Sequence, residues 1–136
     1  MKADWLDGTE PGRDGVLALV DRALQLRAGA APKRFPGARV GAVFLNPSLR
    51  TRTSLESACA LLGVHPIVLQ PGVDAWGWEF RDGVVMDGAS PEHARDAIPV
   101  LASYVDLLAV RSFARLVDPD EDRADPVLHA FASLAN

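Results

Sequence analysis

Hydroxyl and guanidinium side chains stand close together in the segment Ser48-Leu49-Arg50-Thr51-Arg52. Hydroxyl groups donate hydrogen bonds, and guanidinium groups offer a planar fork of N–H donors that matches phosphate oxygens. The segment leads into an expected helix, whose first turn presents unpaired backbone N–H groups and the positive end of the helix dipole. These features together predict an anion site of the phosphate-binding kind.

A purely structural interpretation of the same residues is also open. Ser48 and Thr51 can cap the helix while Arg50 and Arg52 lie in solvent. The sequence contains neither the Gly-x4-Gly-Lys phosphate loop nor the Gly-x-Gly-x-x-Gly dinucleotide fingerprint. The residues alone therefore leave an anion site and a simple helix cap as competing interpretations.

Alternating helices and strands are expected to position this segment. The predicted strands are residues 39–45, 64–69 and 106–110. The predicted helices are residues 9–29 capped by Thr9, residues 51–62, a third opened by Ser90 as N-cap and Pro91, and residues 126–134. A long irregular connection is expected over residues 70–89, and an acidic solvated linker over 120–125. This order predicts an α/β fold, a parallel sheet with helices on both faces.

Arg111 follows the last predicted strand, just as the Ser48–Arg52 segment follows the first. Ligands of open parallel sheets bind beyond the carboxyl ends of the strands. We therefore expect Arg111 and the Ser48–Arg52 segment to meet at one edge of the sheet.

The composition is that of one ordinary folded domain. The chain has 136 residues, of which 49% are apolar and 24% charged, and its formal net charge is −4. The acidic balance argues against broad nucleic-acid binding. A lone cysteine, Cys59, excludes an internal disulfide and is expected in the core. No run matches a signal core or a membrane span, so we expect a cytoplasmic protein, and we expect no metal or other cofactor.

The segment Ser48–Arg52 resembles the Ser-x-Arg-Thr-Arg carbamoyl-phosphate signature of the aspartate/ornithine carbamoyltransferase superfamily. The match covers essentially the whole chain, including a strand ending in Phe44, a Ser-x-Glu helix, a long loop and a strand followed by Arg111. The resemblance implies that carbamoyl phosphate is held by Ser48, the backbone N–H of Leu49, Arg50, Thr51 and Arg111. It also implies catalytic roles for Arg50 and Arg111.

Several residues resemble the branch that acts on acylated ornithines. The similarity to that branch lies in Asn46-Pro47 before the serine, Leu49 inside the signature and the loop Gln70–Trp76. Aspartate carbamoyltransferases place a lysine in this loop, whereas this chain has lysine only at Lys2 and Lys33, which weakens the aspartate alternative. The resemblance implies a homotrimer in which Trp76 reaches the adjacent subunit. The alternative is that Trp76 anchors the loop in its own core, a role for which Trp78 is the stronger candidate.

Pro91 stands fifteen residues after Trp76. In this branch a glutamate at that place goes with N-acetylornithine and a proline with N-succinylornithine, so the resemblance favours the succinyl substrate. A carboxylate there would repel the succinyl carboxylate. A proline in a first helical turn is also common for conformational reasons alone.

The resemblance implies transfer of a carbamoyl group to the δ-amine of N-succinylornithine or N-acetylornithine in arginine biosynthesis. Family enzymes have a second, ornithine-binding domain and a His-Pro-Cys-Gln motif, and this chain contains neither. We therefore expect residues 1–136 to be a carbamoyl-phosphate-binding domain that is inactive alone. The alternatives are a non-catalytic anion-binding or trimerisation module and a fragment of an ordinary ornithine carbamoyltransferase.

Overall fold

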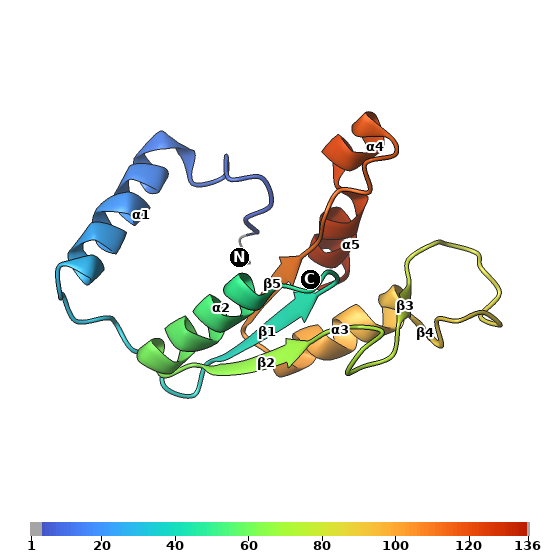
Figure 1. The fold of residues 1–136 in the computed structure, drawn as a ribbon, viewed down its shortest axis with the longest axis horizontal. Helices are drawn as coiled ribbons and strands as arrows, with labels where there is room; N and C mark the ends of the chain where they lie inside the picture. The colour runs from blue at the N-terminus through green and yellow to red at the C-terminus, as the bar shows by residue number, and fades with distance from the viewer. Residues whose placement is uncertain (1–3, 136) are drawn as a thin grey trace.

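A three-stranded parallel sheet forms the centre of the computed structural model, which describes residues 4–135 (Figure 1). The strands are β1 (Arg39–Phe44), β2 (His65–Leu69) and β5 (Leu107–Arg111), in the order β2-β1-β5. The register pairs Val43 with Leu69 and Phe44 with Arg111, so all three strands end at the same edge. The predicted strands are confirmed to within about one residue at each end.

Helices cover both faces of this sheet, as the sequence predicts. Val43 belongs to a core cluster with residues of α3 (Ala94–Tyr104) and α5 (Pro126–Leu134). Ala42 and Phe44 alternate with Val43 and are also buried, on the face where α2 (Leu49–Leu62) runs beside β2 (Figure 1). Burial on both faces explains why β1 reads as a continuous apolar run.

The core lies between the sheet and the α3–α5 layer. Its buried members are Val43, Ala94, Ile98, Leu101 and Phe131. Trp78 and Phe80 come from the long connection after β2 and place their rings 6.0 and 6.2 Å from the ring of Phe131. Tilted aromatic pairs at this spacing stabilise the packing, so the connection is tied to the core at this point.

The first helix differs from the prediction. Helix α1 is Gly12–Arg27, with Pro11 as an N-cap that makes no side-chain bond. Thr9 does not cap it, because its hydroxyl donates instead to Asp7 (2.7 Å). The helix has no buried residue, and it stands apart from the sheet in Figure 1.

The start of α3 also differs from the prediction. Two short parallel strands, β3 (Trp78–Glu79) and β4 (Glu92–His93), pair within the region expected to be irregular or helical. Pairing with β3 keeps Glu92 and His93 extended, so α3 begins at Ala94 with His93 as its cap, the ring Nδ1 accepting from the Arg95 N–H (3.1 Å). Ser90 and Pro91 therefore precede the helix and do not open it.

The expected acidic linker contains a short helix, α4 (Pro119–Ala124). Asp118 caps it by accepting the backbone N–H groups of Asp120 (2.9 Å) and Glu121 (3.2 Å). A capping aspartate followed by Pro119 is a helix-start signal. The segment is acidic and largely exposed as predicted, but it is helical over Pro119–Ala124. Within residues 4–135, no helix has the length and apolar character needed to cross a bilayer.

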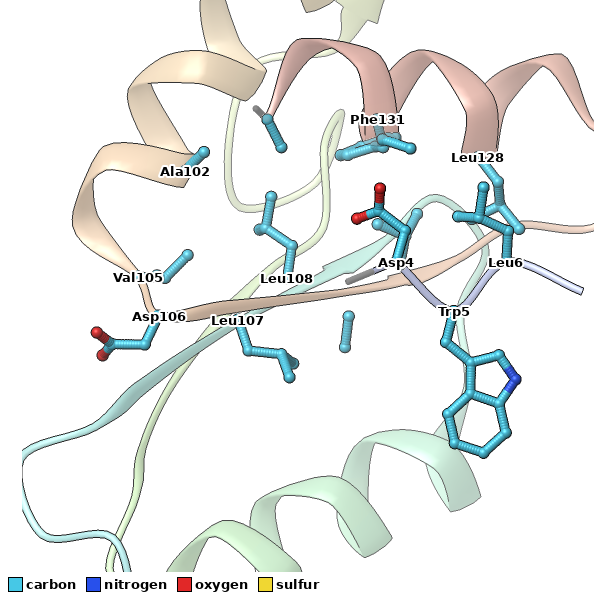
Figure 2. Close-up of a pocket in the computed structure, with 14 residues that line it drawn as sticks. Asp4, Trp5, Leu6, Ala102, Val105, Asp106, Leu107, Leu108, Leu128 and Phe131 are labelled. Atoms are coloured by element: carbon cyan, nitrogen blue, oxygen red, sulfur yellow. The ribbon is translucent and has the colours of Figure 1, made fainter. Parts of the chain in front are cut away.

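A groove of about 620 Å³ runs along the free edge of β5 (Figure 2). Leu108 points from the strand toward α5, from which Phe131 and Leu128 line the groove. Among the described residues of its lining, Asp4 and Asp106 are the charged ones. The described lining therefore offers carboxylates and no cation to an incoming anion.

Ile98 offers a test of the core, because it is fully buried on α3. Ile98→Ala should lower the free energy of unfolding by about 2–5 kcal/mol, through lost apolar burial and the cavity that remains. Val100→Ala is the matched control on the same helix, since Val100 is 58% exposed and its truncation should change stability by less than about 0.5 kcal/mol. Urea unfolding curves measure both, and equal effects would contradict the described core.

Candidate functional site

The connection from β1 to α2 places Ser48 at the amino terminus of the helix. Ser48 is extended (φ −157°, ψ 113°), and its Oγ accepts from the backbone N–H of Thr51 (3.2 Å). The same hydroxyl donates to Oγ1 of Thr51 (3.0 Å). The backbone N–H groups of Leu49 and Arg50 lie in this first turn and have no acceptor within the helix. Capping therefore uses one donor of the turn and leaves others free for a ligand.

Arg111 joins this turn from β5. Because Phe44 and Arg111 are paired at the ends of β1 and β5, the Arg111 side chain emerges beside the β1–α2 connection. Its Nη1 donates to Oγ1 of Thr51 (2.8 Å), across 60 residues of sequence. The structure thus brings Arg111, at the end of β5, to Ser48 and Thr51, which follow β1, at one edge of the sheet, as the sequence predicts.

The positive charge of Arg111 has no negative partner in the described part of the chain. The described ion pairs do not include it, and its Nε is buried without a hydrogen-bond partner. Leaving a buried charged donor unsatisfied costs free energy that a bound anion would recover. Helix dipole, free N–H groups and this cation therefore give one electropositive turn suited to phosphate or carboxylate oxygens.

The two arginines of the Ser48–Arg52 segment have different environments. Arg52 pairs with Glu56 one turn further along α2 (Nε to Oε1, 3.0 Å), on the helix surface. Arg50 is exposed, and no hydrogen bond or ion pair joins it to another described residue. Arg50 is therefore the guanidinium in this segment that is free to meet a ligand, whereas Arg52 is already occupied.

Trp76 and Trp78 have separate roles in the long connection. Trp78 packs against Phe131, and its indole N–H donates to the carboxylate of Glu92 (3.1 Å), so it anchors the connection as expected. Trp76 is 66% exposed and is not an anchor of its own core. Pro91 is also exposed, next to Glu92. No described hydrogen bond joins Trp76 to Ser48, Thr51 or Arg111.

Phe113 and Asn46 shape the surroundings of Arg111, and the sequence did not predict this role for either residue. The ring of Phe113 lies 4.4 Å from the guanidinium carbon of Arg111, and the backbone N–H of Phe113 donates to Oδ1 of Asn46 (2.8 Å). The signal available in the sequence was an aromatic residue two positions after a strand-end arginine. An aromatic residue at that position does not by itself show which side chain its ring will contact.

A tight ion pair stabilises the connection near Trp78. Glu79 of β3 accepts from the Arg81 guanidinium (2.8 and 3.1 Å) and from its backbone N–H (2.9 Å). These hydrogen bonds to the charged form lower the pKa of Glu79 from 4.5 to about 2. The same pair raises the pKa of Arg81, so both groups are ionised at neutral pH.

Comparison with known proteins gives the family. Residues 4–133 match the family described as aspartate/ornithine carbamoyltransferase, carbamoyl-P binding domain. The chain is 46% identical over 115 residues to an N-acetylornithine carbamoyltransferase of Xanthomonas campestris, covering 85% of this chain and 34% of that one. It is 46% identical over 89 residues to an N-succinylornithine carbamoyltransferase of Bacteroides thetaiotaomicron, covering 65% of this chain and 28% of that one.

Solved structures agree with the sequence comparison. A crystal structure of an N-acetyl-L-ornithine transcarbamylase mutant, with a glutamate replaced by proline, superimposes with a TM-score of 0.88 at 42% identity. The superposition covers 98% of this chain and 40% of the transcarbamylase chain. That mutant enzyme is complexed with carbamyl phosphate and N-succinyl-L-norvaline. The chain therefore belongs to the aspartate/ornithine carbamoyltransferase family, and it spans about a third of the length of the curated relatives it matches.

The Glu79–Arg81 pair gives a prediction about pH. Because the folded pKa of Glu79 is about 2, against an ordinary 4.5, the pair stabilises the fold fully above about pH 4.5. That contribution is lost as pH falls through about 2. In Arg81→Gln, the pKa of Glu79 should return toward 4.5, as measured by a ¹³C NMR titration of its carboxyl carbon.

The matched control for this titration is Arg95→Gln. That substitution removes the ion pair with Asp82 (2.8 Å) and leaves Arg81 in place, so the pKa of Glu79 should stay low. A wild-type Glu79 that titrates near 4.5 would show that the described pair does not exist in solution.

Proposed function

We propose that this chain is the carbamoyl-phosphate-binding part of a carbamoyltransferase acting on an N-acylated ornithine. The observation that carries the proposal is the unneutralised Arg111 cation, bonded to Thr51 at the amino terminus of α2. Membership of the family assigns carbamoyl phosphate as the anion for such a site. The phosphate would be held by Ser48, the backbone N–H of Leu49, Arg50, Thr51 and Arg111.

The proposed reaction needs a positive environment at the carbonyl oxygen. The neutral δ-amine of the ornithine attacks the carbamoyl carbon, so a C–N bond forms and the carbonyl oxygen gains negative charge. The C–O bond to phosphate then breaks, phosphate leaves with the bonding electrons, and the proton lost by the amine passes to the departing phosphate. Arg50 and Arg111 would stabilise the charge that develops, with Thr51 assisting. A charge-assisted hydrogen bond of this kind is typically worth about 1.5–3 kcal/mol.

Pro91 supports N-succinylornithine over N-acetylornithine as the acceptor. Transcarbamylase variants in which one glutamate is replaced by valine, serine or alanine are 41% identical to this chain, whereas the proline variant is 42% identical. The higher sequence identity to the proline variant is expected if this chain has proline at the aligned position. The four variants were each complexed with carbamyl phosphate and N-succinyl-L-norvaline. An uncharged residue there removes the repulsion that a glutamate would exert on a succinyl carboxylate.

The proposal extends to the assembly. In it, residues 1–136 form the carbamoyl-phosphate domain, a second domain supplies the amino-acid site, and Trp76 enters the adjacent subunit of a homotrimer. Trp76 is 66% exposed, so its ring is available to a neighbouring subunit, which supports this arrangement. A cytoplasmic role in arginine biosynthesis completes the proposal.

Loss of Arg50 or Arg111, the two site arginines without a carboxylate partner among the described residues, tests the anion site. Arg50→Ala and Arg111→Ala should each lower carbamoyl-phosphate affinity by about ten- to a hundredfold, the equivalent of one charge-assisted bond. Calorimetric titration at fixed low salt measures the affinity. Arg52→Ala is the matched control, because Arg52 is engaged by Glu56 (3.0 Å) and its loss should change affinity less than about threefold. Wild-type affinity in both test variants would refute the assignment.

A chimeric enzyme tests the acyl preference. Residues 4–133, which match the family model, would replace the corresponding domain of the Xanthomonas campestris relative, which is 46% identical to this chain over 115 residues. The chimera should carbamoylate N-succinylornithine with a higher kcat/KM than N-acetylornithine, and Pro91→Glu should reverse that order. Pro71→Glu, another proline replaced in the same connection, is the control and should keep the order. A chimera that prefers N-acetylornithine with Pro91 in place would contradict the succinyl proposal.

A further inference from the structure

We propose that Asn46 and Phe113 position the Arg111 guanidinium for the anion, a role that rests on the proposed function. Asn46 accepts a hydrogen bond from the backbone N–H of Phe113, and the guanidinium carbon of Arg111 lies over the ring of Phe113. Neither residue is placed in contact with substrate, so both act through Arg111.

The first step concerns the hydrogen bonds that join the segments following β1 and β5. Leu45 N–H donates to the Arg111 carbonyl (2.9 Å), which extends the β1–β5 ladder past the last strand residues. In a regular parallel ladder, the next donor, Phe113 N–H, would bond to the Leu45 carbonyl. It donates instead to the side-chain Oδ1 of Asn46 (2.8 Å). The amide of Asn46 therefore replaces a backbone acceptor where the chain turns away toward Pro47.

The second step is the contact between ring and cation. The guanidinium carbon of Arg111 lies 4.4 Å from the centre of the Phe113 ring, within the range of a cation–π interaction. Phe113 is 59% exposed and is not part of the buried core cluster. Burial in the core therefore does not explain the position of this ring. Its contact with the Arg111 guanidinium does.

The third step is what this contact leaves free. Stacking uses the face of a guanidinium, and its N–H donors all lie in the plane. Nη1 is already bonded to Thr51 (2.8 Å), which fixes the rotation of the group within that plane. Nε is buried and unpartnered among the described residues. Because the Thr51 bond and the ring contact both restrain the guanidinium before the anion arrives, less side-chain freedom is lost on binding.

Variants at Phe113 separate positioning from packing. Phe113→Leu keeps an apolar side chain and removes the π face, whereas Phe113→Tyr keeps the face. Phe113→Leu should weaken carbamoyl-phosphate binding about threefold or more, as expected for loss of a cation–π contact, and Phe113→Tyr should restore wild-type affinity. Asn46→Ala should weaken binding in the same direction. Leu116→Ala, at an 88% exposed position of the same loop, is the control and should bind as wild type.

A spectroscopic signature accompanies the binding measurements. In ¹⁵N-arginine-labelled protein, the Nε–Hε signal of Arg111, assigned by its loss in Arg111→Lys, should be shifted upfield by the ring current of Phe113. The shift should vanish in Phe113→Leu, persist in Phe113→Tyr, and shrink in Asn46→Ala. A substitution that only lowered global stability would not change the Arg111 shift in this order across the three variants.

The outcomes separate this proposal from the proposed function. Wild-type affinity in Phe113→Leu and Asn46→Ala would overturn the positioning role while the anion site stands. An Arg111 signal unchanged by Phe113→Leu would show that the ring does not stack in solution and would overturn it too. If the wild-type chain binds neither carbamoyl phosphate nor inorganic phosphate, the anion site itself fails and the positioning role with it, even where the ring-current shift is present.

Discussion

The site depends on one unneutralised positive charge held at the junction of two strands. Arg111 is bonded to Thr51, lies over the ring of Phe113, and has no carboxylate partner among the described residues. Folding a guanidinium into that place is unfavourable unless something else stabilises it. Here the stabilising groups are neutral, a hydroxyl and an aromatic ring, so the charge remains available to a ligand.

The register of the sheet is what creates this junction. Pairing of Phe44 with Arg111 brings the end of β5 beside the turn that leads into α2. A slip of one residue would send the Arg111 side chain to the opposite face of the sheet. The buried residues of β1 oppose such a slip, since Val43 must face the α3–α5 core while Ala42 and Phe44 face the other layer. Core packing and site geometry are therefore set by the same pairing.

The connection between β2 and α3 links the core to the exposed part of the proposed site. Trp78 packs on Phe131 and bonds to Glu92, so the two arms of this connection are joined where β3 meets β4. Trp76 lies two residues before that anchor and Pro91 one residue before Glu92. The anchor fixes the bases of both arms, while the two residues with proposed roles in the assembly and in acyl choice remain exposed.

Local signals in the sequence determined the strands, the helices α2 and α5, and the electropositive turn at Ser48. An apolar run, a capping hydroxyl and a terminating Gly63 with φ of 70° act over a few residues and need no distant partner. Tertiary structure decided the rest. Helix α3 begins at Ala94 because Glu92 and His93 pair with β3. Phe113 meets Asn46 across 67 residues, and Arg111 meets Thr51 across 60, so both contacts exist only once the sheet has formed.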